Sequence, residues 1–308
     1  MIGSVVLDRY LVEEELGRGA MGTVYRGKHT KLKRHVAIKI MHEHLLGQPE
    51  LRERFRREAS AAGKLAHPNI VGVLDAGEVD DRPVMVMEYA QGRSLADAMD
   101  QPVPRLQMLR WVGQLLNGLS HAHGMGLVHR DLKPDNVILV EEAGEEVARI
   151  VDFGIAILRA PDDPKDGIKL TATGMLVGTP VYMAPEQARA DRVDHRADLY
   201  ALGIIIYEMI SGKTPFDGTS MEVALAKIDN DPPPIEQRAP GVTIDRVLDA
   251  FMRRLLARDP EQRFATALTA YEVLELYLHD RDAAATALGV IDVDRALQVV
   301  WLPDAPHR

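Results

Sequence analysis

The chain has 308 residues, of which 46% are hydrophobic and 27% charged, a balance typical of a globular protein with about two domains. Its net charge of −9 argues against a general nucleic-acid binder, which usually carries a basic face. The absence of cysteine excludes disulfides, thiolate catalysis and cysteine–zinc sites. The longest apolar stretch, residues 201–210, contains Glu208 and is shorter than the roughly 18 residues of a membrane span, and the first residues do not resemble a signal peptide. We therefore expect a cytoplasmic protein with no membrane segment and no nucleic-acid partner.

Short strands dominate the chain up to about residue 85, and helical periodicity begins near residue 94. Alternating apolar residues predict strands at 10–17, 22–29, 35–41, 71–77 and 83–88. A helical stripe over residues 50–66 interrupts them, and short strands near 128, 137–140 and 148–151 interrupt the later helices. We predict an α+β fold of two lobes, a small β-rich lobe (8–90) and a larger, mainly helical lobe (91–278), with a ligand cleft between them. The role of the tail, residues 279–308, is not indicated by its sequence.

Three glycines, Gly17, Gly19 and Gly22, follow the first strand in the spacing G-x-G-x-x-G. This spacing occurs in dinucleotide-binding folds, where a helix follows the last glycine, and also in hairpins that cover the phosphates of ATP. The residues after Gly22, Thr23-Val24-Tyr25, are β-formers and predict a strand. The pattern therefore favours the hairpin, whose backbone can approach phosphate closely because glycine has no Cβ.

A lysine on the inward face of a strand is the next candidate. Ala37 and Lys39 share one face of strand 35–41, and an inward lysine needs an anionic partner. Glu58 lies on the apolar face of the predicted helix at 50–66. We expect Lys39 and Glu58 to form an ion pair that holds the lysine ammonium against the α- and β-phosphates of ATP.

Residues 127–139, LVHRDLKPDNVIL, contain groups suited to phosphoryl transfer. Asp131 can accept the proton of a substrate hydroxyl or orient that hydroxyl, and Lys133 can neutralise charge on the transferring group. Asn136 and Asp152 offer hard oxygen ligands for Mg²⁺. The histidines nearby, His121, His123 and His129, are interpreted as packing residues.

These motifs, together with Val36-Ala37-Ile38-Lys39, Asp152-Phe153-Gly154 and Ala184-Pro185-Glu186, occur in an order that resembles the eukaryotic-like serine/threonine protein kinases found in bacteria. The resemblance covers about residues 8–278 and implies the two-lobed kinase fold, protein substrates, and ATP with Mg²⁺ or Mn²⁺ as cofactors. It implies that Asp131, Lys133, Lys39 and Glu58 are catalytic and that Asn136 and Asp152 bind the metal. The implied nucleotide site consists of Leu16, Gly17, Gly19, Gly22, Val24, Ala37, Lys39, Met87, Glu88, Ala90, Asn136 and Asp152, with Met87 as the gatekeeper.

The resemblance also implies how the substrate polypeptide is held. Lys133 and Gly178-Thr179-Pro180 are typical of serine/threonine rather than tyrosine kinases, and Thr179 is expected to seat the substrate residue beside Asp131. Residues 178–187 are called the peptide-seating segment below. By the same resemblance, Asp198 braces the catalytic loop and Arg263 pairs with Glu186.

Two threonines, Thr171 and Thr173, lie in the long stretch between Asp152 and Glu186. A phosphothreonine adds strong acceptor oxygens and negative charge that an arginine can bind. We expect both threonines to be phosphorylated in trans within a kinase–kinase dimer. We expect Arg130 to bind these phosphates and so to contribute to activation.

Two alternatives remain beside an active protein kinase. A pseudokinase would usually lack the lysine, the catalytic aspartate or the metal-binding aspartate, and all three are present. A kinase-fold enzyme acting on small molecules would usually lack the peptide-seating segment, which is also present. Phosphate appearing on threonine after incubation with Mg-ATP would separate the enzyme from the scaffold.

Overall fold

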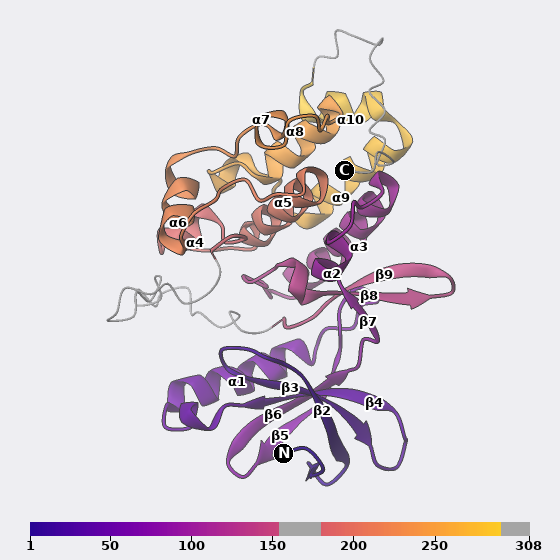
Figure 1. The fold of residues 1–308 in the computed structure, drawn as a ribbon, viewed down its shortest axis with the longest axis vertical. Coiled ribbons are helices and arrows are strands. Elements are labelled where there is room, and N and C mark those ends of the chain that lie inside the picture. Colours follow the sequence, from indigo (N-terminus) through magenta and orange to yellow (C-terminus); the bar gives the residue numbers. More distant parts are fainter. Residues whose placement is uncertain (154–179, 291–308) are drawn as a thin grey trace.

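The computed structural model describes residues 1–153 and 180–290, and these residues form two lobes (Figure 1). The N-terminal lobe is mainly β-sheet, and the C-terminal lobe is mainly helical. This arrangement is the predicted α+β architecture. Within the described residues, no helix is both long enough and apolar enough to cross a membrane. Thr171, Thr173 and Thr179 lie outside the described residues.

The N-terminal lobe contains one antiparallel sheet of six strands in the order β1-β2-β3-β4-β6-β5. The strands are β1 (Val5–Val6), β2 (Tyr10–Arg18), β3 (Gly22–His29), β4 (His35–Met41), β5 (Val73–Val79) and β6 (Arg82–Glu88). The five strands predicted from alternation are present with small shifts at their ends. The two-residue strand β1 was not predicted, because two residues are too few to show an alternating pattern.

Helix α1 (Pro49–Ala62) packs beside β5 and β6 (Figure 1). Proline occupies one of its first two positions, where a missing N–H costs nothing, and Gly63 caps its C-terminus. It therefore ends earlier than the predicted limit of residue 66. A short 3₁₀ turn, Glu43–Leu45, links β4 to this helix.

The two faces of the sheet bury separate apolar clusters. Ile38 and Ile40 on β4 belong to the cluster on one face, whereas Met41 belongs to the cluster that also contains Phe55 of α1. Successive side chains of a strand point to opposite faces, so Lys39 shares the face of Met41. Lys39 therefore points toward the α1 side of the sheet.

A second sheet of three short strands opens the C-terminal lobe, in the order β7 (Gly92–Ser94), β8 (Val137–Glu142) and β9 (Glu145–Ile150). Gly92 is required here, because a Cβ at this position would overlap the carbonyl oxygen of Leu139. The strand expected near residue 128 is not formed, and residues 127–129 are irregular. The backbone N–H of His129 instead donates to the side chain of Asp198, so that this segment is held by side-chain contacts.

The remainder of the C-terminal lobe is a group of helices around one large apolar core. The helices are α2 (Leu95–Met99), α3 (Arg105–Gly124), α4 (Pro185–Ala188), α5 (Arg196–Ser211), α6 (Ser220–Asp229), α7 (Ile235–Arg238), α8 (Arg246–Leu255), α9 (Ala267–His279) and α10 (Arg281–Leu288). Two short 3₁₀ turns, Pro134–Asn136 and Pro260–Gln262, complete the described elements. Helix α5 is buried on nearly all sides, as its almost continuous apolar sequence requires.

The two lobes are joined through the backbone beside Ile150. Ile70 of the N-terminal lobe forms a parallel bridge with Ile150, and the N–H of Val71 donates to the carbonyl of Ile150 over 2.9 Å. The side chain of Asn69, which is buried, donates to the carbonyl of Ala148 over 3.0 Å. These contacts hold strand β9 close to the sheet and so determine where Asp152, which follows it, lies relative to Lys39.

Candidate active site

The glycine-rich segment forms the turn of the β2–β3 hairpin. Gly17 is paired with Val24, and the N–H of Gly19 donates to the carbonyl of Gly22 over 2.9 Å. A Cβ at Gly22 would overlap the carbonyl oxygen of Ile40 on β4, so only glycine fits. Because a strand and not a helix follows Gly22, the hairpin prediction is confirmed and the dinucleotide-binding alternative is excluded.

His42, which was not singled out from the sequence, contacts this hairpin. Its Nε2 lies 2.8 Å from the carbonyl oxygen of Gly19, and its own N–H donates to the carbonyl of Met21 over 3.0 Å. A histidine directly after a predicted strand gave no signal of this contact. The position of the glycine turn is therefore set partly by a residue from the end of β4.

Lys39 connects the two lobes. It is 6% exposed, and its Nζ lies 2.9 Å from Oδ1 of Asp152. Its strand places it opposite Val24 on β3 and Met85 on β6. The ion pair therefore joins the centre of the N-terminal sheet to a residue two positions after β9.

Glu58 does not contact Lys39 in this structure, contrary to the ion pair that we expected. Glu58 is 2% exposed and pairs with Arg54 of its own helix, with 3.4 Å between Arg54 Nε and Glu58 Oε1. Among residues 1–153 and 180–290, no group donates a hydrogen bond to Oε1 of Glu58. Burial raises the pKa of Glu58 to about 7, against the opposing effects of Arg54 and Lys39. The expected pair is not formed because the ammonium of Lys39 is paired with Asp152 instead.

Asp131, Lys133 and Asn136 lie together on the loop before β8. Lys133 Nζ is 3.3 Å from Asp131 Oδ2. Asn136 Nδ2 donates to the carbonyl of Asp131 over 2.8 Å, and it also lies 3.4 Å from Asp131 Oδ2. The loop thus presents a carboxylate with a cation beside it, as the segment 127–139 predicted.

The buried side chain of Asp198, in the first turn of α5, anchors this loop by accepting hydrogen bonds from its backbone. Its Oδ1 accepts the N–H of Arg130 over 2.7 Å, and its Oδ2 accepts the N–H of His129 over 2.8 Å. Arg130 has φ of 62°, a backbone conformation unfavourable for a side chain of this size, and the two hydrogen bonds stabilise it. The predicted bracing contact of Asp198 is confirmed.

His123 of α3 also binds Asp198, with Nε2 2.8 Å from Oδ2. Burial alone would raise the pKa of Asp198, but the hydrogen bonds from His123 and His129 outweigh it and hold the pKa below its ordinary value. The interpretation of His123 as a helix-packing residue and not a metal ligand therefore did not include this contact with Asp198. His129 is buried as predicted, with its ring edge against Phe153 and Nε2 3.0 Å from the carbonyl oxygen of Val151.

Asp152 and Asn136 are adjacent through the backbone, because the N–H of Val151 donates to the carbonyl of Asn136 over 2.9 Å. Asp152 has φ of 60°, a left-handed conformation that directs its carboxylate toward Lys39. The amide nitrogen of Asn136 is bound to Asp131, which leaves its amide oxygen as a ligand. An amide oxygen and a carboxylate fit a hard divalent cation.

The strand β6 ends in the residues expected to bind adenine. Met87 is buried opposite Ala37, while Leu16 on β2 is exposed. The backbone N–H of Glu88 donates to the carbonyl of Gly72 over 2.9 Å. A ligand that contacts the backbone of Glu88 would therefore bind the carbonyl group of Glu88. The Glu88 carboxylate lies between two arginines, Arg34 at 3.5 Å and Arg149 at 3.4 Å.

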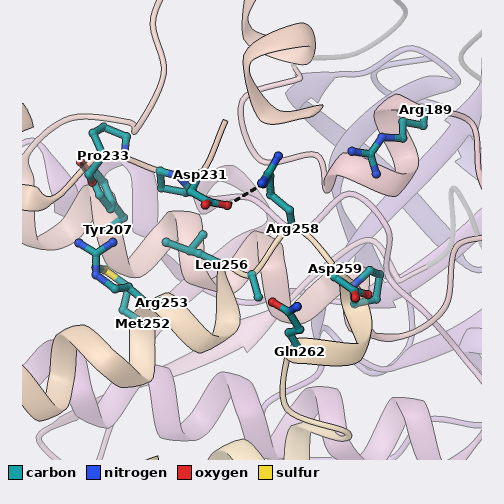
Figure 2. Close-up of a pocket in the computed structure, with 13 residues that line it drawn as sticks. Arg189, Tyr207, Asp231, Pro233, Met252, Arg253, Leu256, Arg258, Asp259 and Gln262 are labelled. Carbon is teal, nitrogen blue, oxygen red and sulfur yellow. Dashed lines mark hydrogen bonds and ion pairs between the residues drawn. The ribbon is translucent and has the colours of Figure 1, made fainter. Parts of the chain in front are cut away.

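The buried pair Arg263–Glu186 connects the peptide-seating segment to the end of the lobe. Nη1 and Nη2 of Arg263 lie 2.7 and 2.8 Å from the two oxygens of Glu186, a bidentate geometry. The prediction of this pair is confirmed. A separate hollow of about 580 Å³, drawn in Figure 2, is lined by residues of α5, α8 and the segments around them, and none of them belongs to the site described above.

Comparison with known proteins agrees with this geometry. Residues 10–275 match the model of the protein kinase domain family. Over 271 residues, the chain is 38% identical to the serine/threonine-protein kinase pkn3 of Myxococcus xanthus, covering 86% of this chain and 49% of that protein. It is 39% identical to PknB of Mycobacterium leprae over 267 residues, covering 84% of this chain and 41% of that protein.

A solved structure is also similar. The crystal structure of the kinase domain of Mycobacterium tuberculosis PknI aligns with a TM-score of 0.67 at 29% identity, covering 89% of this chain and 98% of that one. The chain spans about half the length, or less, of the curated relatives described here.

Proposed function

Since this chain belongs to the protein kinase family, among the relatives of bacterial serine/threonine kinases, we propose that it transfers the γ-phosphoryl group of ATP to serine or threonine hydroxyls of proteins. The observation that carries the proposal is the Lys39–Asp152 ion pair of 2.9 Å, which brings the motifs of both lobes together. A scaffold that binds no nucleotide would have no need of this buried pair beside an intact catalytic loop. The proposal assigns the two lobes to residues 8–90 and 91–278.

Asp131 is the proposed proton acceptor. The substrate hydroxyl donates its proton toward the Asp131 carboxylate, while its oxygen bonds to the γ-phosphorus and ADP leaves with the bridging oxygen. Lys133, 3.3 Å from Asp131, neutralises charge that develops on the phosphoryl oxygens. Asp198 keeps this loop in its strained conformation, so Asp131 does not have to be reoriented during the reaction.

Asn136 and Asp152 are the proposed ligands of Mg²⁺ or Mn²⁺. A divalent cation bound there supplies charge neutralisation for the phosphates of ATP. In the nucleotide complex, Lys39 contacts the α- and β-phosphates, Glu58 supports Lys39, and the backbone of Gly17, Gly19 and Gly22 covers the phosphates.

The adenine end of the proposed nucleotide site is formed by Leu16, Val24, Ala37, Met87, Glu88 and Ala90. Met87, buried opposite Ala37, limits how far the base can enter and acts as the gatekeeper. We place the reaction in the cytoplasm, where ATP is available.

Activation is proposed to occur by autophosphorylation in trans at Thr171 and Thr173, with Thr179 seating the substrate residue and Arg130 reading the phosphates. The double variant Thr171→Ala, Thr173→Ala should lose most of its activity on an external protein after prolonged incubation with ATP. Activity equal to that of the wild type would reject this switch.

The proposed function is tested by incubating the purified protein with Mg-ATP and a degenerate peptide library, followed by mass spectrometry. We expect phosphate on serine or threonine with the wild type and not with Asp131→Asn, which keeps the size of the side chain but removes its charge. Phosphate transfer by neither protein would reject the proposal, as would equal transfer by both.

A further inference from the structure

Lys227, on helix α6, is a buried cation that none of the motifs above includes. It is 1% exposed, and its Nζ donates to the backbone carbonyls of Val181 and Met183, the latter over 2.8 Å. Both carbonyls belong to the peptide-seating segment. Helices α4 and α6 lie side by side at one end of the C-terminal lobe, which brings this lysine against that segment (Figure 1).

Within the part of the chain that the structure describes, the surroundings of Lys227 contain an aromatic ring but no counter-charge. Its Nζ lies 5.1 Å from the ring centre of Tyr200 on α5, and the guanidinium of Arg263 lies 5.0 Å from the centre of the same ring. Among the described residues, no carboxylate pairs with Lys227, and burial lowers its pKa to about 7. An ammonium buried in this way is costly unless its donors are satisfied, so the two carbonyls are its essential partners.

Helix α6 does not depend on Lys227 alone for its position. Arg189 donates to the carbonyl of Ile228 over 2.9 Å, and Arg258 donates to the carbonyl of Asp229 over 2.9 Å. Arg258 is also paired with Asp231 over 2.6 Å, as Figure 2 shows. The C-terminal end of α6 is thus fixed separately, and the contact specific to Lys227 is with the peptide-seating segment.

We propose that Lys227 is a positioning residue for the protein substrate, a role that rests on the proposed kinase function. By holding the carbonyls of Val181 and Met183, it fixes the backbone against which the substrate polypeptide lies. Loss of its donors should weaken the binding of the polypeptide and leave nucleotide binding unchanged, because Lys39 and Asp152 belong to separate elements. Tyr182, between the two carbonyls, donates to Glu208 of α5 over 2.6 Å, and Glu186 remains paired with Arg263, so the segment stays anchored when Lys227 is lost.

The test uses a threonine peptide selected on the wild-type protein from a degenerate library. Lys227→Met keeps an unbranched apolar chain but removes the donors, and Lys227→Arg restores a cation. The matched control is Leu225→Ala, a change at an exposed position of the same helix. We expect the peptide KM of Lys227→Met to rise about tenfold, as for the loss of a hydrogen bond to a charged donor, while the ATP KM stays within about twofold.

Partial recovery of the peptide KM in Lys227→Arg, and no change in Leu225→Ala, would complete the expected result. A peptide KM that stays constant in Lys227→Met would overturn the proposal, and so would an equal rise in both KM values. Circular dichroism reports whether Lys227→Met folds. If it does not fold, Lys227→Gln, a shorter and neutral donor, takes its place, and an unchanged peptide KM in that variant overturns the proposal. A wild-type protein that phosphorylates no peptide would instead refute the proposed function itself.

Discussion

Glu58 is expected to make the folded protein less stable as the pH rises, and Glu58→Gln should remove that effect. Glu58 is 2% exposed, and burial raises the pKa of its carboxyl group from 4.5 to about 7. The folded state therefore holds this proton more tightly than the unfolded chain does. Stability from this group is fully present below the unfolded pKa and is lost as the pH rises from about 4.5 to about 7.

The size of the effect follows from the separation of the two pKa values. At about 1.4 kcal/mol per pH unit, the difference between 4.5 and about 7 corresponds to an upper value of roughly 3 to 4 kcal/mol. Part of this loss of stability has already occurred at pH 5, because Glu58 in the unfolded chain, with a pKa of 4.5, is mostly ionised at that pH. Between about pH 5 and about pH 8, we expect the free energy of unfolding to fall by roughly 2 kcal/mol through Glu58 alone.

The assay is urea unfolding of the wild type and of Glu58→Gln at both pH values, followed by circular dichroism. We expect Glu58→Gln to gain roughly 2 kcal/mol relative to the wild type on going from about pH 5 to about pH 8. Glu53→Gln is the control, because Glu53 lies on the same helix, is half exposed and pairs with Arg57 over 2.9 Å. A stability difference between Glu58→Gln and the wild type that is the same at both pH values would refute this reasoning.

Three further variants test the nucleotide site. Lys39→Met should fold and lose about 100-fold or more of its phosphoryl transfer, because an electrostatic contact to the phosphates is removed; near-normal autophosphorylation would contradict the role of Lys39. Asp152→Asn should lose the gain in ATP affinity that Mg²⁺ gives the wild type, and titration calorimetry with and without Mg²⁺ would contradict this if both proteins showed the same gain. Met87→Gly should accept an ATP analogue enlarged on the base, and failure to use that analogue would remove Met87 from the gatekeeper position.

Local sequence patterns were sufficient to predict the strands of the N-terminal sheet and the site residues that lie close together along the chain. Strands β2, β3 and β5 alternate between more buried and less buried side chains over at least part of their length, so a period of two is visible there. Strands β4 and β6 are buried on both faces and read instead as short apolar runs of β-formers. The glycine hairpin could be predicted for the same reason, since the residues after Gly22 continue as strand β3. Asp131 and Asn136 could be predicted to lie together because they are five residues apart on one loop.

Contacts between distant segments could not be predicted in this way. The segment around Val128 contains β-formers, yet its neighbour His129 is bound by Asp198 from another helix, and no strand forms there. Lys227, in the sequence ALAKIDN, has the appearance of an ordinary surface lysine. Its burial results from the packing of α6 against α4, which no local pattern specifies.

The ion-pair partner of Lys39 also could not be predicted from local sequence, and the choice between its two possible partners bears on the proposed function. Two carboxylates, those of Asp152 and Glu58, are placed to attract one ammonium, and in this structure Asp152 holds it at 2.9 Å. In the proposed metal complex, a divalent cation on Asp152 would neutralise its charge, and Asp152 would no longer attract Lys39. Lys39 would then be available to the phosphates and to Glu58, whose ionised form would gain a partner. Addition of Mg-ATP should therefore lower the pKa of Glu58 and reduce the fall in stability between about pH 5 and about pH 8 in the wild type. In Asp152→Asn, which lacks this competition, Lys39 should face Glu58 already, and the same fall should be small without nucleotide.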